Sequence, residues 1–421
     1  MEISNQIPII YKDKSLTPFV FYSEFLLDVA NFYSVSKDKE NSVEFKLIEG
    51  NDLDFTRKKS YIDPITLPLL LSLFQQLKNH HKKPIKLHLS NTPITIDVLE
   101  YLYHAQFFYI AGDNINPNFP LGRHILDFDN IYLGGFKGKS IRTEHKLRCY
   151  SLNDDNLKNK LIEFNEGESA KRDYLVEYYT YKVKEHFYDL LFENDTTNHL
   201  TNEFIEILAE LITNGVLHSK SDAFVLMFSD KFKTKFAISD NGIGLYESLN
   251  NKKDASEFYV KFELLKSLSS SFPLRIDEKI KNSVLILFET LYYSMLKDRQ
   301  GLFDLMCNVV IDCSGYFRLH TDNAQIIVSA RMLNELSKLY ETRLQILSTH
   351  HSLLFGKIKN QDFKEIMVNL KEICKKQMIE LAGSILKKHS DDSRFSALRI
   401  FEVRFKGVHI EVEIPNSIEK I

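Results

Sequence analysis

The chain has 421 residues, of which 44% are hydrophobic and 26% are charged; these ordinary globular values exclude a fibrous repeat and a wholly disordered chain. Its 54 Lys and Arg residues against 57 Asp and Glu give a formal charge of −3, so it lacks the basic excess of a general nucleic-acid binder. The longest apolar stretch, 283–296, is too short to cross a bilayer. With no export signal at its start and no cysteine framework, we expect a cytoplasmic protein of two or three domains.

The first 130 residues alternate between helical and strand patterns. Helical spacing of apolar residues runs through 19–32, from Thr66 onward and through 96–105, and alternating strands are expected at 43–47 and 85–89. This succession predicts a small α/β domain over residues 1–130. Its order loosely resembles STAS-type regulatory domains, which bind protein partners. Residues 131–170 are more polar and are predicted to be a connector with a hairpin turn at Gly134-Gly135.

A helix with a polar ladder is predicted near residue 210. Its apolar face is formed by residues spaced three and four apart: Phe204, Ile207, Leu208, Leu211 and Ile212. On a neighbouring stripe stand Glu210, Asn214 and His218, each one turn apart. The Asn214 amide oxygen suits Mg²⁺, and Glu210 can accept a proton from a water that attacks a phosphate. His218, beside the helix end, would equally suit the terminal carbonyl groups.

Two short strands, 224–228 and 236–239, follow this helix and lead into Asp240-Asn241-Gly242-Ile243-Gly244. An aspartate at a strand end can accept a hydrogen bond from an exocyclic amine such as that of adenine. Gly242 and Gly244 have no Cβ, so the backbone there can adopt positive φ and let a flat base approach closely. These residue types in this order favour a nucleotide site.

The two motifs together resemble the N-box and the first glycine box of the GHKL ATP-binding superfamily. That superfamily includes type II topoisomerase ATPase subunits, heat-shock-90 chaperones, histidine kinases, mismatch-repair proteins and anti-sigma-factor kinases. The resemblance implies a two-layer α/β sandwich over residues 171–421, with ATP and Mg²⁺ as ligands and a mobile lid between the two glycine boxes. It also implies Glu210 as the catalytic base, Asn214 as the Mg²⁺ ligand, and His218, Asp240, Gly242 and Gly244 as nucleotide-binding residues.

A second glycine signal, Arg299-Gln300-Gly301-Leu302, precedes a helical run over 302–310. In the family a box of this type opens a helix whose backbone amides meet the phosphates, and the resemblance assigns Gly301 and Leu302 to that role. Arg299 would add positive charge near the γ-phosphate. This chain has one glycine where two are common in the family, which leaves the lid contacts open.

The C-terminal part predicts one further strand and a helical insertion. Residues 408–414 alternate between apolar and polar and predict a half-buried strand that resembles the last strand of the superfamily sheet. Before it, about 331–392, two apolar stripes predict an inserted helical hairpin, which either packs on the core or serves as an arm for dimerisation or partner docking. The predicted fold class is therefore α+β.

Three functions agree with these patterns. The first is a Mg²⁺-dependent ATPase that uses ATP as a conformational or dimerisation switch, with a homodimer implied by the resemblance. The second is a Ser/Thr protein kinase of the anti-sigma-factor type acting on a STAS-like partner. The third is an ATP sensor or scaffold that does not hydrolyse its ligand. All three imply an unidentified protein partner and involve neither a membrane nor nucleic acid.

Overall fold

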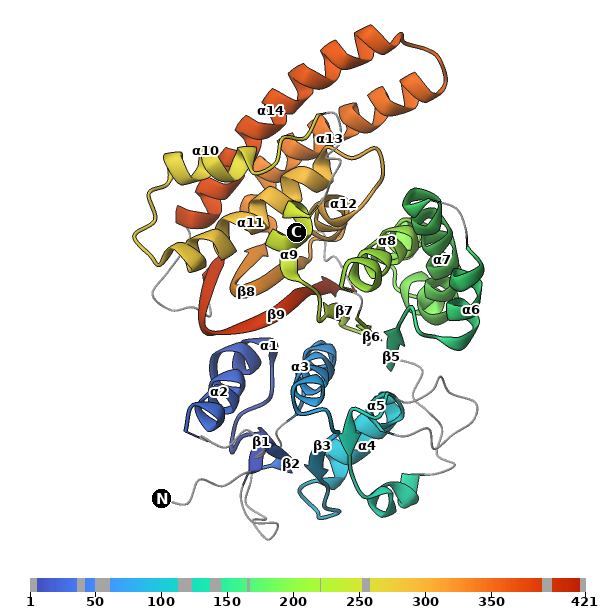
Figure 1. Cartoon of the computed structure of the whole chain (residues 1–421), viewed down its shortest axis with the longest axis vertical. Helices are drawn as coiled ribbons and strands as arrows, with labels where there is room; N and C mark the ends of the chain where they lie inside the picture. The colour runs from blue at the N-terminus through green and yellow to red at the C-terminus, as the bar shows by residue number, and fades with distance from the viewer. Residues whose placement is uncertain are drawn as a thin grey trace.

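The computed structural model describes residues 6–35, 42–49, 61–112, 123–136, 145–164, 167–219, 221–251, 258–387 and 396–416. It is an α+β structure with one parallel and one antiparallel sheet (Figure 1), which confirms the predicted class. Within the described ranges, no helix combines the length and the apolar character needed to cross a membrane.

The N-terminal unit is built on a four-stranded parallel sheet in the order β1-β2-β3-β4. Because parallel neighbours need crossover connections, helices alternate with these strands. The elements of this unit are β1 (Gln6–Ile10), α1 (Pro18–Val20), the π-helix η1 (Phe21–Phe25), α2 (Leu26–Val35), β2 (Glu44–Ile48), α3 (Thr66–His81), β3 (Ile85–His88), α4 (Ile96–His104), α5 (Phe107–Ala111), β4 (Leu126–Asp127) and the 3₁₀ helix η2 (Asn130–Phe136).

The second unit is built on a five-stranded antiparallel sheet in the order β5-β6-β7-β9-β8. Its strands are β5 (His145–Tyr150), β6 (Ala223–Ser229), β7 (Lys233–Asp240), β8 (Tyr316–Val328) and β9 (Leu398–Pro415). Its helices are α6 (Asp155–Glu163), α7 (Glu168–Phe192), η3 (Asn198–Leu200), α8 (Thr201–Ser219), α9 (Gly244–Asn250), α10 (Glu263–Ser271), α11 (Glu278–Met295), α12 (Leu302–Cys307), η4 (Asn308–Asp312), η5 (Ala330–Met332), α13 (Leu333–Leu354) and α14 (Asn360–Lys387).

The antiparallel sheet is covered on both faces. Helices α7, α8 and α11 contact one face, and α2 and α3 of the N-terminal unit contact the other (Figure 1). Side chains alternate across a strand, so in β6 Val225 and Met227 pack into the core with α8 and α11, while Phe224 and Leu226 pack against the N-terminal unit. The nearly continuous apolar run of β6 is therefore explained by burial on both sides.

Two predictions about the middle of the chain differ from the structure. The expected connector, 131–170, contains β5, an edge strand of the antiparallel sheet, and helix α6. The prediction of a hairpin turn at Gly134-Gly135 is wrong, because both glycines lie in η2. Local composition misses β5 because its partner, β6, lies more than 70 residues further along the chain.

The predicted helical hairpin is formed by α13 and α14. Its inner stripe is part of the main core: Leu336, Leu339, Met367, Cys374 and Leu381 are fully buried. Leu344 and Ile366, expected on the apolar stripes, are 47% and 40% exposed. The hairpin thus packs on the core through part of each stripe, and α14 contacts α10, α11 and β8.

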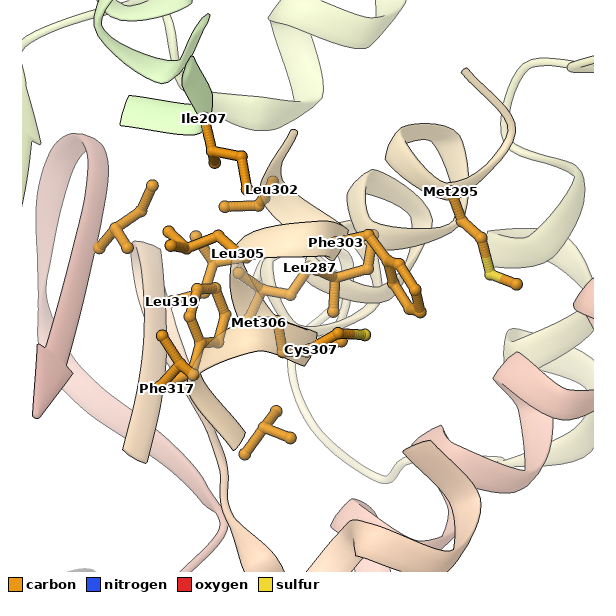
Figure 2. Packing of buried hydrophobic residues seen from close by; sticks show 14 of the residues in the cluster. Ile207, Leu287, Met295, Leu302, Phe303, Leu305, Met306, Cys307, Phe317 and Leu319 are labelled. Carbon is orange, nitrogen blue, oxygen red and sulfur yellow. The ribbon is translucent and has the colours of Figure 1, made fainter. Parts of the chain in front are cut away.

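Helix α12 occupies the centre of this core. It is buried along its whole length, and Figure 2 shows its side chains between Ile207 of α8, Leu287 and Met295 of α11, and Phe317 and Leu319 of β8. The helical run expected over 302–310 changes at Asn308 into the π-helix η4.

Candidate functional site

A cavity lies between α8, α9, α11 and the ends of β7 and β9. Its volume available to the centre of a water molecule is about 120 Å³; since one such position needs about 10–15 Å³, the cavity has room for a group the size of a purine base. Its lining combines an apolar majority with a few polar groups, as ligand sites commonly do. The lining residues are Leu211, Asn214, Gly215, Ile238, Asp240, Gly242, Ile243, Gly244, Leu245, Ser248, Leu249, Thr290, Tyr293, Ser294, Lys297, Leu302, Val408 and Ile410.

Asp240 stands at the end of β7 and is 8% exposed. Its Oδ1 accepts hydrogen bonds from the backbone N–H groups of Gly242, at 2.7 Å, and Val408, at 3.4 Å. Burial raises the pKa of this carboxyl to about 7, although both N–H bonds act in the opposite direction. Within the part of the chain that the structure describes, Oδ2 accepts no hydrogen bond, so this oxygen can meet a ligand.

Two glycines let the backbone close around Asp240. Gly407 has φ of +111°, and a Cβ there would stand 1.9 Å from the Asp240 carbonyl oxygen, which no side chain tolerates. Gly244 has φ of +78° and opens α9. The expectation of positive φ at both box glycines is correct only for Gly244, because Gly242 makes its tight Asp240 turn without it.

The polar ladder of α8 meets the cavity at Asn214, whose Nδ2 donates to Glu210 Oε1 at 3.3 Å. Glu210 lies one turn back from the lining residues and is 4% exposed. Its Oε1 also pairs with the Arg172 guanidinium of α7 and lies 3.9 Å from Lys297 Nζ. The carboxylate is therefore held between two cations beside the cavity wall.

Lys297 and the loop that follows α11 form the basic side of the cavity. Lys297 Nζ stands 4.9 Å from the centre of the Tyr293 ring, in cation–π contact. Burial lowers the pKa of Lys297, and neighbouring Glu210 partly offsets that shift. We refer to residues 295–301 as the basic loop.

The basic loop is held from outside by one buried arginine of α13. Arg343, with none of its surface exposed, pairs with Asp304 through Nε at 2.8 Å and Nη2 at 3.0 Å. Its remaining N–H groups donate to three carbonyl groups of the basic loop, those of Met295, Lys297 and Arg299. All five donors of the guanidinium are thus used.

The second glycine box is placed differently from the expectation. Gly301 N–H donates to Asp304 Oδ2 at 2.8 Å, and Phe303 N–H donates to Ser294 Oγ at 3.1 Å. The Gly301 amide, expected to meet phosphates, and the nearby Phe303 amide therefore already have protein partners. Leu302 does line the cavity, whereas Arg299 is half exposed and pairs with Asp173 Oδ1 at 2.6 Å.

Two parts of the expected site fall wholly or partly outside the described residues. The backbone of His218 lies in α8, but its side chain is outside the described part of the chain. The stretch 252–257 of the expected lid is also outside it. Lys261, further along the expected lid, is described, and its Nζ donates to the Asn250 carbonyl at 2.9 Å.

Several residues that line the cavity lie outside the sequence motifs, although the sequence carries a signal for them. Thr290, Tyr293, Ser294 and Lys297 follow the i, i+3, i+4, i+7 spacing of one helix face. A polar stripe on an otherwise apolar helix marks a face turned to a cavity, and it could have identified Lys297. Arg172 and Arg343 offered no such signal, because their roles depend on contacts between distant elements.

The comparisons with known proteins returned no matching family, no matching curated protein and no matching solved structure.

Proposed function

We propose that the chain binds ATP in this cavity and hydrolyses it, using the ligand as a conformational or dimerisation switch. The observation that carries the proposal is the convergence of Asn214, Asp240, Gly242 and Leu302, from three separate segments, on one base-sized cavity with Glu210 beside it. The resemblance of the sequence motifs to the GHKL superfamily implies the same residues as ligands of the nucleotide and its Mg²⁺.

The Asp240 side suits an adenine base. Asp240 Oδ2 would accept a hydrogen bond from the exocyclic amine, while Oδ1 is held by two backbone N–H groups. Apolar side chains from β7, β9 and α9 supply the faces against which a flat ring packs, among them Ile238, Ile410 and Leu249. An aspartate oriented in an apolar cavity discriminates strongly, because without a donor opposite it the buried acceptor stays unpaired.

The other side of the cavity, where Lys297 and Arg172 lie, suits the negatively charged phosphates. Lys297 and Arg172 flank Glu210, so phosphate oxygens entering here would compete with Glu210 for both cations. Glu210, released from part of that pairing, would accept the proton of a water aligned on the γ-phosphate. Hydrolysis would form a bond from the water oxygen to the γ-phosphorus and break the bond from that phosphorus to the bridging oxygen, which leaves with ADP.

A Mg²⁺ ion fits this site only if the nucleotide supplies most of its ligands. The described residues contain no group of three or more His, Cys, Asp or Glu that would hold a metal ion by themselves. Asn214 donates to Glu210 through Nδ2, which leaves its Oδ1 as the protein oxygen for the ion, the other ligands being phosphate oxygens and water. Bound there, Mg²⁺ would neutralise phosphate charge.

Phosphate release and nucleotide binding test the proposal together. Purified protein with Mg-ATP should release phosphate, and Glu210→Gln should lower the rate at least about 100-fold while ATP affinity, measured by calorimetry, stays within about threefold. Asp240→Asn should weaken ATP binding but leave the protein folded, which circular dichroism would check. Phosphate release by Glu210→Gln at the wild-type rate would refute the role of this residue, and wild-type protein that binds no ATP would refute the proposal.

The pairing of Glu210 with Arg172 favours a second candidate, an ATP sensor that does not turn over. If ATP binding leaves this pair intact, the carboxylate cannot act as a base. ATP binding without phosphate release, in wild type and in Arg172→Ala alike, would support the sensor. Label transfer from ATP to a protein partner would instead support the predicted kinase, and sedimentation with and without ATP tests the predicted homodimer.

A further inference from the structure

The second residue of the first glycine box, Asn241, turns away from the cavity into the N-terminal unit. Asn241 is 8% exposed, and its amide is enclosed by side chains of α3. Its Oδ1 accepts hydrogen bonds from Ser72 Oγ and, at 2.9 Å, from Gln76 Nε2; its Nδ2 donates to Gln75 Oε1 at 2.8 Å. We call Ser72, Gln75, Gln76 and Asn241 the amide clamp.

The amide clamp also reaches the segment of β9 that holds Asp240. Gln76 Nε2 donates to the Lys406 carbonyl at 3.1 Å, immediately before Gly407, whose backbone lies against the Asp240 carbonyl. Val408, two residues on from Lys406, donates to Asp240 Oδ1. One α3 side chain therefore ties together the turn after β7 and the segment of β9 whose N–H groups orient the carboxylate.

The hydrogen bonds of the clamp are more directional than is needed only to hold the two units together. Ser72 and Gln76 are spaced four residues apart on one face of α3, and Gln75 is further held by Asp222 Oδ2 at 2.6 Å. Elsewhere on α3 the buried side chains are mostly apolar: Leu70 and Phe74 are fully buried, and the Phe74 ring packs against Phe45 of β2. Apolar burial alone would hold α3 in place, whereas directional amide bonds fix the loop position as well.

We propose that Ser72, Gln75 and Gln76 are positioning residues for Asp240, and that through them the N-terminal unit sets the affinity of the cavity for its adenine nucleotide. This inference rests on the proposed function for the ligand and on the clamp geometry for the mechanism. Any partner of the N-terminal unit that displaces α3 would then loosen Asp240 and weaken nucleotide binding, and ATP would in turn oppose that displacement.

The test compares Asn241→Ala and the double variant Ser72→Ala/Gln76→Ala with the control Lys78→Ala. Lys78 lies on the same helix, but its Nζ donates to the Arg123 carbonyl within the N-terminal unit. Hydrogen exchange of the segments 240–244 and 406–409 needs no nucleotide. Exchange there should be at least about five- to tenfold faster in both clamp variants, because each loses three hydrogen bonds of the clamp, and unchanged in the control.

Calorimetry with ATP supplies the second readout. Both clamp variants should bind ATP about five- to tenfold more weakly than the wild type. Asn241→Gln should bind ATP as weakly as Asn241→Ala, because its longer side chain displaces the amide. Faster exchange with unchanged ATP affinity, or equal effects in Lys78→Ala, would overturn the positioning role. If the wild type binds no ATP, the proposed function fails, while unchanged exchange in the clamp variants would separately overturn the control of Asp240 by α3.

Discussion

The two sides of the cavity are held by different chemistry. The Asp240 side is held by the amide clamp, whose contacts with Asn241 are hydrogen bonds between neutral groups. The basic loop is held by Arg343, a fully buried cation that pairs with Asp304 and binds three carbonyl groups. A neutral hydrogen bond contributes about 1 kcal/mol net, whereas breaking a buried ion pair from one side costs about 3–5 kcal/mol. The Asp240 side can therefore be adjusted at small cost, while the basic loop is tied to the stability of the fold.

The largest expected effect comes from removing the buried cation. Arg343→Met should lower the free energy of unfolding by about 3–5 kcal/mol, because Asp304 and three carbonyl groups lose their buried partner. Urea denaturation measures this change. Adding Asp304→Asn should restore part of the loss, since the uncompensated charge is then removed. A change below about 1 kcal/mol would contradict the contrast between the two sides.

The next effect concerns the backbone beneath Asp240. Gly407→Ala places a Cβ against the Asp240 carbonyl at a φ of +111°, and it should cost about 2–4 kcal/mol of stability from strain and overpacking. The matched control is Gly356→Ala, which has φ of +65° but open space around the added Cβ, so it should cost only about 1 kcal/mol. Thermal unfolding compares the two, and equal losses would show that the contact with Asp240 contributes nothing.

The pH dependence of ATP affinity should come from the Asp240 side. Burial raises the pKa of Asp240 to about 7, so below pH 7 the free site holds a proton that must leave before the carboxylate accepts from adenine. Affinity should therefore fall by up to tenfold for each pH unit below 7 and level off above it. Calorimetry from pH 5.5 to 8.5 tests this. Asp240→Asn should lack this component, and subtracting its profile removes the titration of ATP itself.

The smallest expected effects are on ATP affinity, and they distinguish the roles of the two cations of the basic loop, Lys297 and Arg299. Lys297 lines the cavity and Arg299 is half exposed beside Asp173. Lys297→Met should weaken ATP binding about tenfold, as expected for a charge-assisted contact with phosphate. Arg299→Met should change it less than about twofold, because an exposed ion pair contributes little. The reverse order would restore the sequence-based role of Arg299 and remove Lys297 from the site.

Local patterns predicted most of the regular elements. The apolar periodicity of 204–212 and the alternation of 408–414 correspond to α8 and part of β9. The edge strands β1 and β5 were not predicted, because they are short and each is specified by pairing with a strand far along the chain. The π-helices η1 and η4 continue helical runs without a distinct residue pattern.

By itself, the sequence determined that Glu210 and Asn214 share one stripe of a helix and that Asp240 follows a strand, and this order predicts a nucleotide site. Only the tertiary structure decided that Asn214 and Asp240 share a cavity, that Lys297 rather than Arg299 lines it, and that Glu210 rests against Arg172. It also decided that α3 and Arg343 hold the two sides of the cavity. The physical reason is range, because periodicity and turn chemistry act between neighbours, whereas buried pairs join side chains that only the packed fold brings together.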